Sequence, residues 1–324
     1  MGSIYLPEMN ADSADSATSS DEAAAKRPVH DAALQAVARR LCRADEAPWL
    51  HGEVARRMAD RLAIMRAQPA AVIDWWSVNG ASGALLKQAY PRSLIQRLEP
   101  RAAQVALKPP GRWWSRRSWT APALPILTPQ TLGPQSADLV WANMMLHWKA
   151  RPQQEMQRWF QALAVDGFLM FSTLGPGSVT ALRRLYERLG WGVPHAPFVD
   201  MHDLGDMLVH AGFAEPVMDQ EILTLSWAEP ASLLAELRTL GGNADPGRFA
   251  GLRTPRWHQR LLGELDALRS VDGRYRLDFE VVYGHAFRPP PRPRIDVQTS
   301  VPLDEMRAMV GAGRRTPGKP IGLG

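Results

Sequence analysis

The 324-residue sequence predicts an α/β fold in which a doubly wound, largely parallel sheet is covered by helices on both faces. Two observations lead to this prediction. Short, strongly apolar runs of strand length alternate along the chain with longer stretches whose apolar residues recur at helical spacing. The apolar runs are nearly continuous, as expected of strands buried on both faces, and the helical stretches between them are long enough to be crossover connections.

Each predicted element is bounded by residues that start or stop helices and strands. Pro69 separates the second helix from the first strand, Gly212 ends the helix before the sixth strand, and Gly241 ends the helix after it. The predicted helices cover 30–44, 48–68, 82–89, 152–164, 201–213, 231–241 and 255–269. The predicted strands cover 71–75, 93–100, 137–142, 167–174, 216–225 and 276–287, and the proline-rich stretch 100–136 is predicted to be irregular.

The two ends of the chain differ in composition from the rest. Residues 1–27 are rich in Ser, Ala and Asp, and residues 289–324 are rich in Pro, Arg and Gly. Neither segment can bury enough apolar surface to offset the entropy lost on ordering. We therefore predict two disordered tails on either side of one domain over 28–288.

Composition also limits the function classes. No apolar run approaches the roughly 18 to 20 residues of a membrane span, and the N-terminus lacks a signal-peptide pattern, so we predict a cytoplasmic protein. The single cysteine, Cys42, excludes an internal disulfide or a cysteine zinc site, and we predict no metal site. The net charge of +5 favours acidic partners, although the arginines are scattered. Nucleic-acid binding is an alternative suggested only by this charge and by the basic, aromatic stretch 112–119.

Five segments carry a resemblance to a known family. They are WLHGEVARRMADRLAIMRAQP (49–69), SADLVWANMMLHW (136–148), GFLMFSTLGPGSVTALR (167–183), PFVDMHDLGDMLVHAGFAEPVMDQEILTL (197–225) and FEVVYGHAF (279–287). In this order they resemble the class I S-adenosylmethionine-dependent methyltransferases, and more narrowly the malonyl-acyl carrier protein O-methyltransferases of biotin synthesis. The resemblance implies a Rossmann-like doubly wound mixed sheet of about seven strands, with flanking helices and a helical insertion before the last strand.

The resemblance also implies a reaction, the transfer of a methyl group from S-adenosylmethionine to the free carboxylate of a malonyl thioester on an acyl carrier protein. The sulfonium already activates the leaving group, so the enzyme has mainly to position the reactants. The carboxylate is ionised at neutral pH and needs no general base. We therefore predict no catalytic acid, base or nucleophile.

Cofactor positions follow from the resemblance as residues near the ends of predicted strands. Asp74 belongs to the end of the first strand, and Asn143 follows the fourth strand. Glu99, at the end of the second strand, would accept hydrogen bonds from the two ribose hydroxyls, a task that suits a carboxylate. Without the resemblance, Glu99 reads equally well as a solvated loop residue, and Asp74 as a loop acid without a ligand.

The turn after the first strand departs from the family pattern. Trp76 and Val78 stand where the family has the first two glycines of its turn, and Gly80 alone keeps the register. The stretch 120–136 also lacks the acidic residue expected beside the adenine. Two hypotheses follow, an active methyltransferase with a rebuilt turn or a catalytically silent relative kept as a binding or regulatory protein. Strand alternation predicts that, of Trp75 and Trp76, one lies in the core and the other near the turn.

Acceptor positions are predicted in two loops and on one helix. The candidate substrate residues are His147, Trp148, Arg183, Phe198 and His202. Arg183 could pair with the acceptor carboxylate, although helix surfaces often carry such arginines. Asp200 precedes a helix, so we expect it to be an N-cap more than a substrate contact.

Overall fold

The computed structural model describes residues 26–41, 46–100 and 126–291. Cys42, the stretch 112–119 and nearly all of the two predicted tails lie outside the described residues. Contacts divide the chain into one unit over Met1–Pro289 and a second over Pro290–Gly324. The first unit contains all the strands and helices described.

Seven strands form one mixed sheet in the order β3-β2-β1-β4-β5-β7-β6. Their bounds are β1 Ala71–Trp75, β2 Leu94–Leu98, β3 Ile126–Leu127, β4 Ala137–Ala142, β5 Leu163–Leu174, β6 Ala214–Trp227 and β7 Tyr275–Phe287. Strands β1 to β5 run parallel, whereas β7 lies antiparallel between β5 and β6. The predicted α/β fold with a mixed sheet of about seven strands is therefore confirmed. The short strand β3 was missed, because two residues within a proline-rich stretch carry no period.

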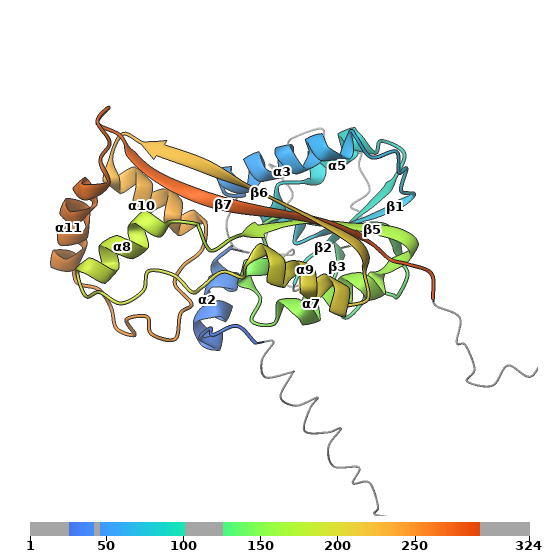
Figure 1. Ribbon diagram of the computed structural model, residues 1–324, viewed down its shortest axis with the longest axis horizontal. Helices are drawn as coiled ribbons and strands as arrows, with labels where there is room; N and C mark the ends of the chain where they lie inside the picture. The colour runs from blue at the N-terminus through green and yellow to red at the C-terminus, as the bar shows by residue number, and fades with distance from the viewer. Residues whose placement is uncertain (1–25, 42–45, 101–125, 292–324) are drawn as a thin grey trace, which may run out of the picture. The chain divides into compact units, whose positions relative to one another are not determined.

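Helices cover both faces of the sheet. They are α2 Asp31–Leu41, α3 Trp49–Leu62, α4 Ser77–Gly80, α5 Gly83–Ala89, α7 Pro152–Ala162, α8 Thr180–Arg188, α9 Met201–His210, α10 Pro230–Thr239 and α11 Pro255–Glu264, with 3-10 turns η2 Leu146–Trp148 and η3 Leu265–Leu268. Helices α3 and α5 lie on one side of the sheet and α7 and α9 on the other (Figure 1). Helices α10 and α11, which lie between β6 and β7 in the sequence, form the predicted helical insertion.

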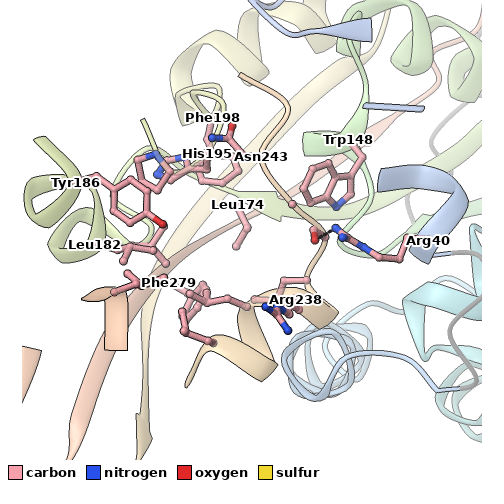
Figure 2. Close-up of a pocket in the computed structure, with 18 of the residues that line it drawn as sticks. Arg40, Trp148, Leu174, Leu182, Tyr186, His195, Phe198, Arg238, Asn243 and Phe279 are labelled. Atoms are coloured by element: carbon pink, nitrogen blue, oxygen red, sulfur yellow. Dashed lines mark hydrogen bonds between the residues drawn. The ribbon is translucent and has the colours of Figure 1, made fainter. Parts of the chain in front are cut away.

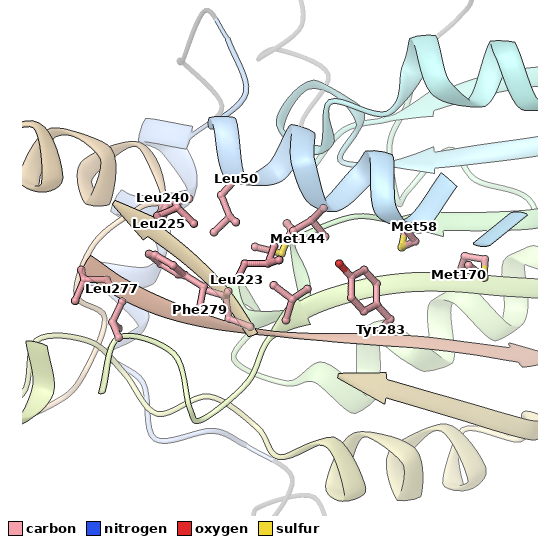
Figure 3. Close-up of a cluster of buried hydrophobic side chains, with 14 of the residues drawn as sticks. Leu50, Met58, Met144, Met170, Leu223, Leu225, Leu240, Leu277, Phe279 and Tyr283 are labelled. Atoms are coloured by element: carbon pink, nitrogen blue, oxygen red, sulfur yellow. The ribbon is translucent and has the colours of Figure 1, made fainter. Parts of the chain in front are cut away.

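Alternation along the central strands builds a separate core on each face. Val72 of β1 packs with Leu50 and Met58 of α3 in one apolar cluster, part of which Figure 3 shows. The next residue, Ile73, packs with Trp159 of α7 and other residues of a second cluster. All five side chains are fully buried. Successive strand residues point to opposite faces, so β1 contributes to both cores.

The described N-terminal residues are anchored to the domain by an arginine. Arg27 is 7% exposed and donates hydrogen bonds to the carbonyl oxygens of His147, at 2.5 Å, and Lys149, at 3.2 Å. It also donates to the carbonyl oxygen of Pro197. Burial lowers the pKa of Arg27 to about 10, so its guanidinium stays charged at neutral pH. The predicted tail over 1–27 therefore ends before Arg27, which joins the loop after β4 to the loop before α9.

Helix α7 is tied to β1 by a buried carboxylate. Glu155 of α7 is 2% exposed and accepts a hydrogen bond from the indole nitrogen of Trp75 at 2.8 Å. Lys149 and Arg158 pair with the same carboxylate at 2.7 and 3.0 Å. A buried charge is stabilised only when hydrogen bonds and opposite charges replace the lost water. Trp75 is therefore both a core side chain and a donor that Glu155 requires.

We expect Trp75→Phe to lower the free energy of unfolding by about 1–3 kcal/mol, because it removes a buried donor to a charged group. Trp49→Phe is the matched control, since Trp49 is 62% exposed and its substitution should cost less than about 0.5 kcal/mol. Urea denaturation followed by circular dichroism measures both values. Equal stability of the two variants would contradict the assigned hydrogen bond.

Candidate functional site

The predicted cofactor residues converge at the carboxyl edge of the parallel strands. Asp74 is the penultimate residue of β1, Glu99 follows β2, and Asn143 follows β4. Asn143 donates a 2.7 Å hydrogen bond to the carbonyl oxygen of Gly80, which ends α4. The charge of Glu99 acts on the pKa of Asp74. The structure thus brings all four predicted residues together at the edge where ligands bind in doubly wound folds.

The rebuilt turn between β1 and α4 keeps a glycine-like backbone. Trp76 has φ 60° and ψ 47°, the left-handed conformation that glycine adopts without strain and other residues rarely adopt. The turn then closes on Glu99, whose Oε1 accepts hydrogen bonds from the Ser77 hydroxyl at 2.8 Å and the Val78 amide at 2.9 Å. The residues that replace the glycine turn therefore use the carboxylate that was predicted to bind ribose.

Both tryptophans of the turn are buried. Trp75 is 0% and Trp76 4% exposed, and both belong to the cluster on the α7 face. The ammonium of Lys149 lies 4.8 Å from the centroid of the Trp76 ring, so this indole reaches the loop after β4. Trp76 therefore lies at the turn as expected, but the expected placement of the two rings on opposite sides is wrong, because both join the same core cluster. Alternation fails at Trp76 because its left-handed backbone has left the strand.

Asn143 positions the backbone on both sides of the edge. Its amide nitrogen donates to the carbonyl oxygens of His51 at 2.8 Å and Gly80 at 2.7 Å. Its amide oxygen accepts from the Ser172 hydroxyl at 2.6 Å. Both of its side-chain polar atoms therefore have protein partners, and Asn143 links α3, α4 and β5.

Several buried polar atoms at this edge have no hydrogen-bond partner. They are both carboxylate oxygens of Asp74, the indole nitrogen of Trp76, both side-chain polar atoms of Asn79, and Nε2 of His51 and of His147. The five side chains are 0–6% exposed. An unsatisfied buried polar group costs about 1–3 kcal/mol, and native proteins keep few of them. Such a group of atoms at one edge points to a polar ligand that would satisfy them.

The protonation states at the edge follow from burial. Burial, and then the charge of Glu99, raise the pKa of Asp74 to about 8. His51 Nδ1 lies 2.8 Å from the Asn79 carbonyl oxygen and must donate to it, which leaves Nε2 as an acceptor. Burial lowers the pKa of His51 to about 4, and burial together with His51 and Arg27 lowers that of His147 well below its usual value. The edge thus offers two neutral imidazoles, of which His51 presents an acceptor, and a carboxyl group that a cationic ligand would ionise.

A cavity of about 300 Å³ opens beside this edge (Figure 2). Leu174, the last residue of β5, lines it together with Phe279 of β7. Both are at most 5% exposed. Arg40 and Arg238 line it as well, and both are exposed to solvent. The cavity therefore combines an apolar interior with a positively charged, accessible side.

The structure divides the predicted substrate residues into three groups. Trp148 and Phe198 line the cavity. His147 lies behind them, with its ring centroid 5.0 Å from that of Trp148 and 6.0 Å from that of Phe198. Arg183 is exposed on α8 and is not among the residues lining the cavity, and the side chain of His202 is 85% exposed. The structure therefore gives neither Arg183 nor His202 a place at the cavity.

Asp200 has the expected capping role. It precedes α9, and its carboxylate accepts a 2.8 Å hydrogen bond from the His202 amide. The same carboxylate oxygen lies 2.8 Å from Nδ1 of His202. The prediction of an N-cap is confirmed, and His202 is held at the surface by the residue that caps its helix.

The sequence interpretation missed four residues of the edge and cavity. His51 sits on the apolar face of α3, where a histidine is usually a core residue, and Asn79 lies within the altered turn. Arg40 and Arg238 occupy the last turns of α2 and α10, where basic residues are common. No local signal in the sequence distinguishes these two arginines from ordinary helix-end residues.

The described residues contain no group of three or more His, Cys, Asp or Glu side chains placed to hold a metal ion. Among the helices in the described ranges, none has the length and apolar character needed to cross a membrane.

Comparisons with known proteins were made at the level of family profiles, solved structures and curated sequences. No family profile matches the chain. Among solved structures, the YcgJ protein of Bacillus subtilis aligns at 9% identity with a TM-score of 0.49, covering 74% of this chain and 99% of that chain.

Curated relatives match over most of their length. The malonyl-[acyl-carrier protein] O-methyltransferase of Laribacter hongkongensis is 40% identical over 259 residues, which are 77% of this chain and 86% of the relative. Its counterpart in Gallionella capsiferriformans is 36% identical over 76% of this chain and 87% of its own. That of Nitrosospira multiformis is 33% identical over 82% of this chain and 90% of its own. The chain therefore belongs to the malonyl-[acyl-carrier protein] O-methyltransferase family.

Proposed function

We propose that this chain is an S-adenosylmethionine-dependent methyltransferase that esterifies the free carboxyl of a malonyl group carried as a thioester on an acyl carrier protein. The observation that carries the proposal is the group of unsatisfied buried polar atoms at the carboxyl edge. Family membership supports the choice of cofactor and acceptor, because the relatives named above bear this activity in their names. The sequence-based prediction of a cytoplasmic location is part of the same proposal.

The described residues fit a polar, cationic cofactor. The unpartnered carboxylate of Asp74 suits a positive group, and the free amide of Asn79 offers both a donor and an acceptor. Nε2 of His51 adds a second acceptor. S-adenosylmethionine would supply a methyl group activated by a sulfonium, so that the S–C bond can break, with its electron pair left on the sulfur of a neutral thioether, as the carboxylate oxygen bonds to the methyl carbon. These residues would hold the cofactor without taking part in bond making.

The chain's own contribution to the reaction is positioning and exclusion of water. The acceptor would enter the apolar cavity, whose lining residues Trp148 and Phe198 pack against His147. The low pKa of His147 keeps its imidazole neutral, so it cannot form an ion pair that would reduce the nucleophilicity of the acceptor carboxylate. Apolar walls remove water from the carboxylate and hold it in line with the methyl group.

A catalytically silent relative is the second candidate function, and one observation favours it. Oε1 of Glu99 already accepts hydrogen bonds from Ser77 and Val78, in the place predicted for the ribose hydroxyls. The buried Trp76 also fills space beside the turn. In this case the cavity would still bind the acyl thioester, and the chain would act by binding alone.

Calorimetric titration with S-adenosylmethionine and S-adenosylhomocysteine separates the two candidates. We expect binding in the micromolar range and transfer of labelled methyl from S-adenosylmethionine to malonyl-acyl carrier protein. Because the acceptor carboxylate must be free, the methyl ester of the same thioester should accept no label. Absence of binding at millimolar cofactor, in a protein shown to be folded, would reject the methyltransferase and support the silent relative.

We expect Trp76→Gly to tighten S-adenosylhomocysteine binding by on the order of tenfold. Glycine adopts the observed φ of 60° without strain, and loss of the indole gives the ligand room at the turn. The same variant should be less stable, because it empties a buried site. Trp76→Phe is the control, since it keeps a large ring and should leave affinity within about twofold of wild type. Unchanged affinity in a folded Trp76→Gly protein would show that the indole does not limit cofactor binding.

We expect the contribution of Asp74 to the stability of the unliganded protein to fall as the pH rises from about 4 to 8, so that wild type loses stability relative to Asp74→Asn over this range. The pKa of Asp74 is raised from 3.8 to about 8 in the folded state, so the folded protein binds one proton more than the unfolded chain in this window. The resulting stabilisation is fully present below pH 3.8 and declines by about 1.4 kcal/mol per pH unit up to pH 8. Asp74→Asn should remove this slope and be the more stable protein at pH 8.

Urea denaturation of both proteins at pH 5, 6, 7 and 8 measures the slope. Asp138→Asn serves as a control, because Asp138 has its amide partners at the start of β1, away from the site. Parallel slopes for wild type and Asp74→Asn would contradict the assigned protonation of Asp74.

A further inference from the structure

The 300 Å³ cavity shares a wall with a second hollow on the protein surface. Arg40, Gly242 and Asn243 line both, and the second hollow, of about 290 Å³, is completed by α2 and by Arg248. Leu174 and Phe279 are buried inside the first cavity, whereas Arg40 and Arg238 are exposed. The shared wall is therefore the solvent side of the cavity, and Leu174 marks the end that meets the carboxyl edge of the sheet.

Two guanidinium groups, those of Arg40 and Arg238, line the cavity near this wall, and the charge of one acts on the other. Figure 2 shows Tyr186 and Arg40 on opposite sides of the cavity, with Arg238 between them in this view. Burial, and then the positive charge of Arg238, lower the pKa of Arg40. Within the described ranges no carboxylate pairs with Arg40, Arg238 or Arg248. Like charges held close together are unfavourable unless an anion joins them.

The wall has a backbone that lets Arg40 and Trp148 approach it closely. Arg40 donates a hydrogen bond to the carbonyl oxygen of Gly241. A Cβ atom on Gly241 would lie 2.3 Å from the Trp148 ring, and one on Gly242 would lie 2.6 Å from an Arg40 nitrogen. Because neither glycine has a side chain, the Trp148 indole can pack directly against Gly241 and the Arg40 guanidinium directly against Gly242. The indole nitrogen of Trp148 is buried and has no partner, so a further donor is available at the same wall.

We propose that Arg40 and Arg238 bind the phosphodiester of the arm that carries the acyl group, and so fix how deeply the arm enters the cavity. The identity of the ligand rests on the proposed function. Because the reacting carboxyl must reach the buried end at Leu174, the anion at the exposed end belongs to the opposite end of the ligand. Guanidinium groups bind phosphate oxygens in a bidentate manner and keep their charge at any physiological pH. The apolar cavity between the two ends accommodates the uncharged part of the arm.

Calorimetry with two matched probes tests this assignment. The probes are malonyl-4′-phosphopantetheine and malonyl-pantetheine, which differ only in the phosphate. We expect wild type to bind the first about tenfold or more tightly than the second, with the advantage falling as salt is raised. In Arg40→Gln and Arg238→Gln the advantage of the phosphate should fall to about twofold or less, while affinity for malonyl-pantetheine stays as in wild type.

Arg256→Gln is the matched control. Arg256 is exposed on α11, the helix that also contributes Trp257 to the cavity, and it makes no ion pair with the described residues. This variant removes the same charge nearby and should keep the preference for the phosphate probe. If Arg256→Gln loses the preference for the phosphate probe as fully as Arg40→Gln and Arg238→Gln do, the preference depends only on the overall positive charge of this region, and the proposal is overturned.

Two further outcomes overturn the proposal. If the Arg40 and Arg238 variants weaken both probes equally, the arginines hold the malonyl carboxylate instead. If wild type shows no preference for the phosphate probe, or binds neither probe at millimolar concentration, no phosphate site exists. Titration with S-adenosylhomocysteine is a separate readout: a phosphate preference without cofactor binding would reject the methyltransferase while leaving this site intact.

Discussion

The hydrogen bonds that Glu99 accepts from Ser77 and Val78 determine the shape of the carboxyl edge. They hold the turn after β1 in a conformation that starts with a left-handed Trp76 and ends at Gly80. The Gly80 carbonyl then accepts from Asn143, which fixes the start of the loop after β4. One carboxylate at the end of β2 therefore orders the backbone of two neighbouring crossover loops, and without it the turn would have no partner for the Val78 amide.

The arrangement of this turn lowers the stability of the protein, because buried polar groups at the carboxyl edge remain without hydrogen bonds. Asp74 and Asn79 are buried with no hydrogen bonds to their side-chain polar atoms, and burial keeps Asp74 protonated up to about pH 8. Apolar side chains at these positions would give a more stable protein, because unsatisfied buried polar groups oppose folding. Residues that lower stability in this way are characteristic of binding sites, where the ligand supplies the missing partners. This cost argues for a ligand even though Trp76 and Val78 replace two glycines of the turn.

Sequence reasoning predicted those parts of the structure that depend on local pattern. The strands β1, β4 and β5 follow from continuous apolar runs, and the resemblance to the family drew attention to Glu99 and Asn143, which the structure places after β2 and β4. The role of Trp76 was not predictable, because its burial depends on a left-handed backbone and on Lys149, some seventy residues away in the chain. Arg40 and Arg238 were missed for the same reason: each is an ordinary helix-end arginine until the fold places both at one cavity.

The two halves of the site are coupled by a short run of residues after β4. His147 interacts with His51 at the carboxyl edge, and its ring packs on Trp148 and Phe198 at the cavity. Arg27 donates to the carbonyl oxygens of His147 and Pro197, so one buried cation holds both loops against each other. A ligand at the carboxyl edge and a ligand in the cavity would therefore both affect the neutral imidazole of His147. Because burial, and then the charges of His51 and Arg27, lower the pKa of His147, the imidazole between the carboxyl edge and the cavity stays neutral, whereas Arg40 and Arg238 place positive charge at the exposed side of the cavity.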